Sequence, residues 1–195
     1  MRDRHADLDA LLAGPAPGSP EFIAFALDPT RNPFSATTIF LMIGGPAEDE
    51  INVGGLRGDL RFRDGTALRK LDSGTTEALT GIFVETPDRI WICGREGTIL
   101  RGNARDGFTN LSFLTDHRLF TSIQIHDGQC WLASNAAPMG VFLYDPNGGR
   151  PERAPGAPRD IHTLSSKKGV LWGFGLKTIA RYENGEWTLI KHPDL

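Results

Sequence analysis

Short apolar and β-branched runs recur along the chain at intervals of about forty residues. Trp91, Trp131 and Trp172 lie 40 and 41 residues apart, each within an apolar run that favours a β-strand. A step of forty residues back from Trp91 reaches Ile51 in the run EINVGG, so four segments share one register. Self-similarity at this period is typical of the blades of a β-propeller.

Three further strands accompany each of these runs. One precedes it, in TIFLMI, LTGIFV, FTSIQI and IHTLSS, and a second follows it, in DLRF, TILR, VFLY and TIAR. The last strands are ALRKL, FTNLSFL, a proline-broken RPER and EWTLI. An Asp-Gly or Asn-Gly pair stands before the last strand, and such pairs supply the positive φ angles of a two-residue hairpin. These pairs begin at Asp64, Asp106, Asn147 and Asn184.

The pattern predicts an all-β fold, a small β-propeller of about four four-stranded blades with repeats of about forty residues. The predicted repeats span residues 36–74, 75–116, 117–157 and 158–195. Residues 1–35 are expected to form an extension with a helix over 3–12, a Pro/Gly linker and a strand over 21–27, of which 22–27 is the candidate closing strand. That strand could close the propeller or cap an exposed sheet edge. The alternative architecture is a β-sandwich in which the tryptophan spacing is coincidental.

Two segments resemble the bacterial β-propeller repeats of the photosystem-assembly and BNR/Asp-box type. They are IWICGREGTILRGNARDGFTNL and LWGFGLKTIARYENGEWTLI, and the third repeat, QCWLASNAAPMGVFLYDPNGG, departs most from the pattern. The resemblance implies an architecture that serves mainly as a binding scaffold. No repeat carries the full Asp-box. Sialidase-type enzymes also need a tyrosine nucleophile, and the only tyrosines are Tyr144 and Tyr182, so the resemblance does not imply that catalysis here.

Composition and charge narrow the class of protein. The 195 residues include 23 Gly and 13 Pro, which indicates many turns. The 21 basic and 24 acidic residues give a net charge of −3, so we expect no general affinity for nucleic acid. No apolar run reaches the roughly 18–20 residues of a membrane helix, and no secretory signal is evident. We expect a cytoplasmic protein, either a monomer or a small homo-oligomer.

The sequence carries no recognised catalytic, cofactor or metal motif. We therefore predict that the chain is not an enzyme and holds no cofactor and no metal. Two alternatives remain: a lyase or hydrolase that uses channel residues such as His162, and a haemopexin-like scaffold with a central ion. Cys93 and Cys130 are too few for a disulfide framework. They are expected to be ordinary buried thiols that could share one interface between blades.

A binding surface is expected where the loops between blades meet the loops that join second and third strands. This face would be basic with few acidic residues, a charge that suits an acidic protein partner or a small anion. The candidate contact residues are Arg57, Arg95, Glu96, His117, Arg118, Met139, Arg159 and Lys177. The sequence thus predicts a non-enzymatic module that holds a protein partner. One concrete version is an immunity-type protein that neutralises a bacterial toxin.

Overall fold

The computed structural model describes residues 39–113, 115–147 and 149–190. The chain divides into two units, Met1–Ile39 and Phe40–Leu195, and all the strands below belong to the second. The helix, linker and strand expected within residues 1–35 lie outside the described residues. None of the helices in the described part is long and apolar enough to cross a membrane.

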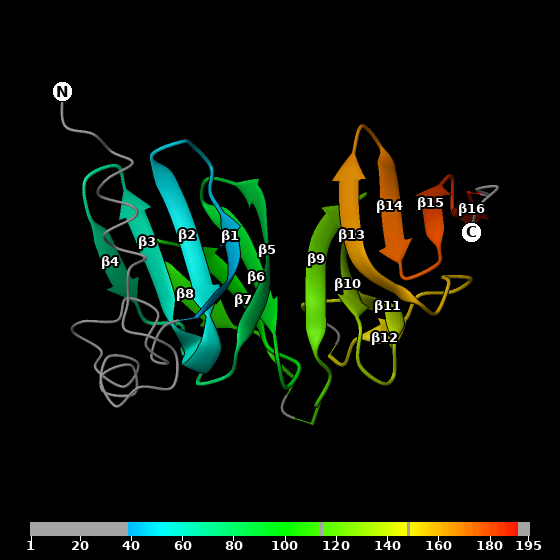
Figure 1. The fold of residues 1–195 in the computed structure, drawn as a ribbon, viewed down its shortest axis with the longest axis horizontal. Helices are drawn as coiled ribbons and strands as arrows, with labels where there is room; N and C mark the ends of the chain where they lie inside the picture. The colour runs from blue at the N-terminus through cyan, green and yellow to red at the C-terminus, as the bar shows by residue number, and fades with distance from the viewer. Residues whose placement is uncertain (1–38, 114, 148, 191–195) are drawn as a thin grey trace, which may run out of the picture. The chain divides into compact units, whose positions relative to one another are not determined.

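The described strands form four antiparallel sheets of four strands each, in chain order within each sheet (Figure 1). The first sheet contains β1 (Phe40–Gly44), β2 (Glu50–Gly55), β3 (Leu60–Asp64) and β4 (Leu68–Leu71), with the short helix η1 (Leu56–Gly58). The second contains β5 (Leu79–Thr86), β6 (Arg89–Gly94), β7 (Ile99–Asn103) and β8 (Gly107–Asn110). The third contains β9 (Phe120–His126), β10 (Gln129–Ser134), β11 (Gly140–Tyr144) and β12 (Glu152–Arg153). The fourth contains β13 (Ile161–Lys167), β14 (Val170–Gly175), β15 (Ile179–Glu183) and β16 (Glu186–Leu189).

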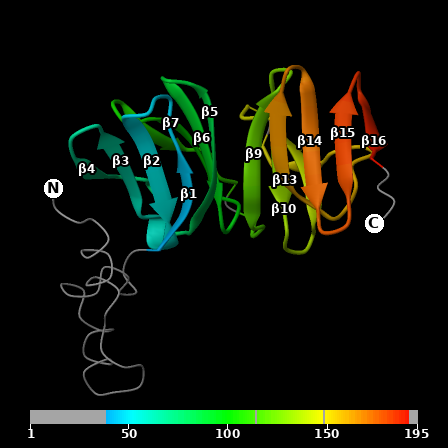
Figure 2. The same cartoon turned by 45° about the horizontal axis from the view of Figure 1, so that its top comes forward.

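The sheets pack in series as propeller blades, and we call them blades 1 to 4. The first strand of each blade contacts the first strand of the next, so β5 lies beside β9 and β9 beside β13 (Figure 2). A hydrophobic cluster fills each boundary between consecutive blades. The predicted all-β fold of four four-stranded blades is confirmed, and the sandwich alternative is wrong.

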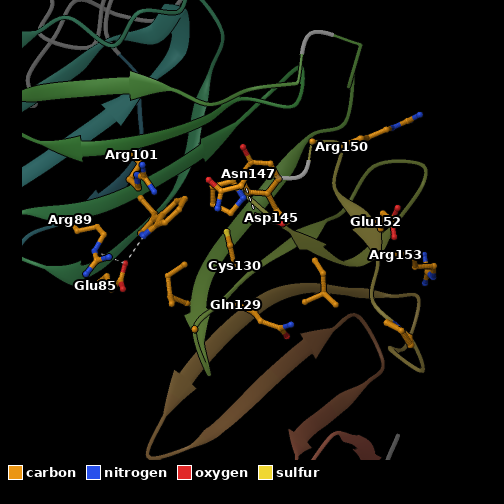
Figure 3. Close-up of a pocket in the computed structure, with 18 residues that line it drawn as sticks. Glu85, Arg89, Arg101, Gln129, Cys130, Asp145, Asn147, Arg150, Glu152 and Arg153 are labelled. Carbon is orange, nitrogen blue, oxygen red and sulfur yellow. Dashed lines mark hydrogen bonds and ion pairs between the residues drawn. The ribbon is translucent and has the colours of Figure 1, made fainter.

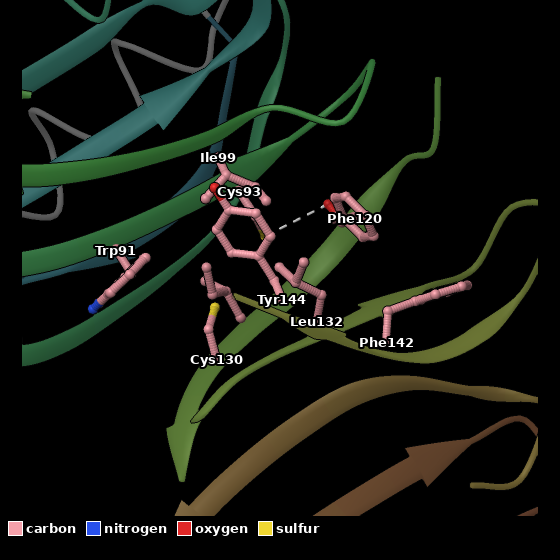
Figure 4. Packing of buried hydrophobic residues seen from close by; sticks show 9 residues of the cluster. Trp91, Cys93, Ile99, Phe120, Cys130, Leu132, Phe142 and Tyr144 are labelled. Carbon is pink, nitrogen blue, oxygen red and sulfur yellow. Dashed lines mark hydrogen bonds between the residues drawn. The ribbon is translucent and has the colours of Figure 1, made fainter. Parts of the chain in front are cut away.

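The cluster between blades 2 and 3 contains both cysteines (Figure 4). Cys93 comes from β6 and Cys130 from β10, and both are buried and unpaired. Burial raises the pKa of the Cys130 thiol to about 12, and it raises the pKa of Cys93 as well. Both thiols are therefore protonated near neutral pH, as expected for structural cysteines.

Three of the four Asp-Gly and Asn-Gly pairs lie wholly within the described residues. Only one of these three forms the expected two-residue turn before the last strand. Asn184 and Gly185 have φ angles of 53° and 85°, which suit a two-residue hairpin. At Asp64 the loop is longer, because the carboxylate Oδ1 accepts hydrogen bonds from the backbone N–H groups of Thr66 and Ala67. In blade 2 the side chain of Asn103 accepts equivalent bonds from Arg105 and Asp106. Side-chain capping thus replaces the tight turn in blades 1 and 2.

Candidate functional site: the loop face

The loops between second and third strands interlock with the loops between blades. The backbone N–H of Gly58 donates to the carbonyl of Glu77 at 2.9 Å, and that of Gly97 donates to Arg118 at 2.8 Å. In blade 4 the backbone N–H of Lys177 donates to the Asp160 carboxylate at 3.2 Å. The two sets of loops therefore share one end of the blades, as the sequence predicted. We call this end the loop face; it comprises residues 56–58, 73–78, 95–97, 115–118, 135–139, 158–160 and 176–178.

Left-handed turns hold the loop face together closely. Gly58 has a φ of 65° and Gly97 a φ of 64°, which glycine adopts without steric cost. A Cβ atom at Gly58 would lie 1.9 Å from the carbonyl oxygen of Thr75, and one at Gly97 would lie 2.6 Å from that of Asp116. Side chains are excluded at both positions, so the loops approach at backbone distance. This packing fixes the neighbouring Arg57 and Glu96 at the surface.

Seven of the eight predicted contact residues are exposed on this face. Four of them are cations that form no ion pair with any residue the structure describes: Arg57, Arg95, Arg159 and Lys177. His117 lies with its Nδ1 atom 2.6 Å from Oε2 of Glu96, so these two side chains engage each other. Met139 adds exposed apolar surface in the β10–β11 loop.

Arg118 is the exception, because its side chain is only 6% exposed. Its Nε and terminal nitrogen donate to both oxygens of Asp116 at 2.7 and 2.5 Å, and the same nitrogen donates to the Pro151 carbonyl at 2.8 Å. The guanidinium also lies 4.3 Å from the ring centre of Phe142. Arg118 therefore joins the loop after blade 2 to blade 3, and its guanidinium is not available to a partner.

The loop face carries more acidic groups than the sequence suggested. Glu96 contacts His117, and Asp116 forms an ion pair with Arg118. Asp160 accepts a hydrogen bond from the backbone N–H of Lys177. The four cations without an ion pair are thus the main source of positive charge on the loop face. A hollow of about 450 Å³ beside Arg57 adds a concave element, with Lys70, Asp72 and Ser73 in its wall. These four cations can attract an acidic surface over a distance of several ångströms.

A second feature, which the sequence did not predict, is a groove of about 690 Å³ between blades 2 and 3 (Figure 3). It lies at the end of the blades opposite the loop face, where first and second strands join. Glu85 accepts a hydrogen bond from the Trp91 indole at 2.8 Å and pairs with Arg89 at 3.2 Å, while Arg101 lies over the Trp91 ring. Gln129 and Cys130 contribute from blade 3.

One sequence signal could have indicated this groove. The proline-broken RPER corresponds to β12, which has only two residues where the last strands of the other blades have four. Pro151 cannot donate a ladder hydrogen bond, so the outer edge of blade 3 is short. Residues on both sides of Pro151, among them Asp145, Arg150 and Pro155, therefore line the groove instead of extending the sheet.

The structure also shows the residues on which the enzyme and central-ion alternatives depend. His162 lies in β13, and its Nδ1 atom is 3.0 Å from Oγ1 of Thr163. Within residues 39–190, as far as they are described, no three His, Cys, Asp or Glu side chains gather in a way that could hold a metal ion.

Fold and loop face together define a β-propeller-type repeat protein. The chain is 29% identical over 154 residues to the immune protein Tsi7 of Pseudomonas aeruginosa, a match that covers 77% of this chain and 48% of Tsi7. The chain thus spans about half the length of this relative. No protein-family model matches the chain.

Solved structures show the same architecture at low sequence identity. YCF48 bound to a D1 peptide matches at a TM-score of 0.57 and 13% identity, covering 78% of this chain and 55% of YCF48. Virginiamycin B lyase from Staphylococcus aureus matches at 0.62 and 14% identity, covering 79% and 56%. The designed protein Ika4 matches at 0.59 and 12% identity, covering 75% and 92%. These likenesses establish the fold and confirm the resemblance to photosystem-assembly-type propellers.

Proposed function

We propose that this chain is a non-enzymatic immunity protein that binds a toxin through its loop face. The observation that carries the proposal is the similarity to the immune protein Tsi7, which extends over most of the described blades. Because the chain covers about half of Tsi7, both the toxin and the manner of its inhibition belong to the proposal. The likeness to virginiamycin B lyase concerns the fold and lends no support to a lyase activity.

The loop face suits a protein partner for two reasons. Its backbone is held by loop-to-loop hydrogen bonds and glycine contacts, so little conformational entropy is lost when a partner docks. Its four unpaired cations lie on a protein whose net charge is −3, which makes the face electrostatically distinct. We infer that the partner presents acidic side chains to Arg57, Arg95, Arg159 and Lys177. The same complementarity would accelerate association and discriminate against basic partners.

A growth-protection assay tests the function. Each protein encoded beside this chain's gene is produced in a bacterial host with and without the chain, and growth is measured. We expect one of these proteins to arrest growth and the chain to restore it. Restoration should be lost in a loop-face variant that changes Arg57, Arg95, Arg159 and Lys177 to Glu.

The matched control makes the same change of charge at the opposite end of the blades. It replaces the exposed residues Arg105, Arg150, Lys167 and Lys168 with Glu. This control should protect as well as the unmodified chain, provided both variants accumulate to the same level. Equal loss of protection in both variants would mean that total charge matters and the loop face does not. A cytoplasmic site of action is part of the proposal, and fractionation of the protected cells checks it.

A further inference from the structure

The blades at the two ends of the series each have a face with no described blade against it. Strand β1 packs on β5, β5 on β9 and β9 on β13, but among the described strands β13 and β1 are not packed in this way. One face of blade 1 and one face of blade 4 therefore have no described strand packed against them. The face of blade 1 comprises Phe40, Ile43 and Val53, and that of blade 4 comprises Trp172, Phe174 and Ile179. We call them the blade-1 end face and the blade-4 end face.

The blade-1 end face has the sequence of an internal blade interface. By strand register, Phe40 is equivalent to Leu79, Phe120 and Ile161, which are all 0% exposed, whereas Phe40 is 41% exposed. Ile43 is 70% exposed, whereas its equivalents Ile123 and Leu164 are 1% and 3% exposed and its equivalent Ile82 is partly buried. The next residue, Gly44, faces the Ile82 side chain of blade 2, so Ile43 faces the other way.

The blade-4 end face repeats this situation on the opposite side. Leu171 packs in the cluster with blade 3, so the neighbouring Trp172 and the alternate Phe174 face away from it. Phe174 is 39% exposed, although its equivalents Cys93 and Ala133 are 0% exposed. Contiguous exposed apolar residues of this kind mark interaction surfaces.

Side-chain hydrogen bonds link each of blades 2 and 3 to the blade that follows it. The Thr80 hydroxyl of blade 2 donates to the Phe120 carbonyl of blade 3, and the Thr121 hydroxyl of blade 3 donates to the His162 carbonyl of blade 4 at 2.7 Å. His162 occupies the equivalent position in blade 4. Its Nδ1 lies 3.0 Å from Oγ1 of the adjacent Thr163, and no described blade follows blade 4 to offer it a backbone carbonyl.

We infer that two copies of this chain associate head to tail, with the blade-4 end face of each against the blade-1 end face of the other. A two-fold arrangement makes both interfaces identical and leaves no end face uncovered. It gives eight blades, within the range of four to eight that β-propellers typically contain. The chain covers 56% of the solved chain of virginiamycin B lyase, which has the same fold, so a propeller of nearly twice this length exists as a single chain.

The mass of the full chain in solution tests this inference. Sedimentation equilibrium should give a mass of twice 21.3 kDa that falls toward 21.3 kDa on dilution. Ile43→Asp and Phe174→Asp, made separately, should each raise the dimer dissociation constant roughly a hundredfold, since each places a charge in an apolar interface. The control is Phe113→Asp, because Phe113 is similarly exposed at 38% but lies in the loop after blade 2, and it should leave the dimer intact.

A mixing experiment tests the head-to-tail geometry. A pair made of one Ile43→Asp chain and one Phe174→Asp chain keeps one native interface, so the equimolar mixture should dimerise more strongly than either variant alone. If only one of the two substitutions weakens the dimer, the two end faces do not meet and the inference fails. A chain that stays monomeric at its highest soluble concentration also overturns it, and would mean that something other than a second copy covers these faces.

Circular dichroism and thermal unfolding keep the result interpretable. Both end-face variants replace exposed residues, so their monomers should retain the β-sheet spectrum. The toxin-binding proposal is independent of this inference, because neither Ile43 nor Phe174 belongs to the loop face. A monomer that still protects against a toxin would overturn the dimer alone.

Discussion

At the scale of single residues, Arg118 shows how one side chain can serve the fold where the sequence suggested a contact. Its position between blades placed it correctly on the loop face, but burial depends on neighbours that are distant in sequence. Pro151 and Phe142 come from blade 3 and surround the guanidinium, while Asp116 pairs with it. Sequence alone therefore identified the loop and could not distinguish an exposed cation from a buried one.

Replacement of Arg118 by Met should lower the free energy of unfolding by about 3–5 kcal/mol, because it leaves the buried carboxylate of Asp116 without its partner. Urea denaturation checks this value. The double variant Arg118→Met/Asp116→Asn should be less destabilised than the single variant, since no buried charge remains unpaired. Arg105→Met, which removes an exposed partner of Asp88, should change stability by less than about 0.5 kcal/mol. A similar small change for Arg118→Met would contradict the structural role.

At the scale of secondary-structure elements, the forty-residue period predicted the strands and their order within each blade. Alternation and turn residues are local properties, so they could be read from the sequence. The turn types were harder, because Asp64 and Asn103 bind backbone N–H groups and thereby lengthen their loops. The groove between blades 2 and 3 also escaped prediction, since its residues come from separate strands.

The Asp64 turn gives a prediction about pH. Hydrogen bonds from Ala67 and Thr66 lower the pKa of the Asp64 carboxyl from 3.8 to about 2. A group whose pKa is lower in the folded state stabilises the protein above its unfolded pKa and loses that effect as pH falls through its folded pKa. The stability difference between the unmodified chain and Asp64→Ala should be constant above about pH 5 and shrink between pH 4 and 2. Urea denaturation across this range checks it, and a difference independent of pH would contradict it.

At the scale of the whole molecule, repetition explains both the blades and the two uncovered faces. Each blade buries one face against its predecessor and one against its successor, and among the described strands one face of blade 1 and one face of blade 4 have no such neighbour. The sequence predicted the repeat but could not show which faces stay exposed. The positions of the loop-face cations could be predicted from the sequence, because the repeat fixes the turns that carry them.

The most direct test of the proposed function is the dissociation constant of the purified toxin complex, measured by titration calorimetry. The loop-face variant with Glu at positions 57, 95, 159 and 177 should bind at least about a hundredfold more weakly than the unmodified chain, since like charges placed in an interface cost several kcal/mol. The control with Glu at positions 105, 150, 167 and 168 should bind with the native constant. Native affinity in the loop-face variant, or equal weakening in the control, would contradict binding through the loop face.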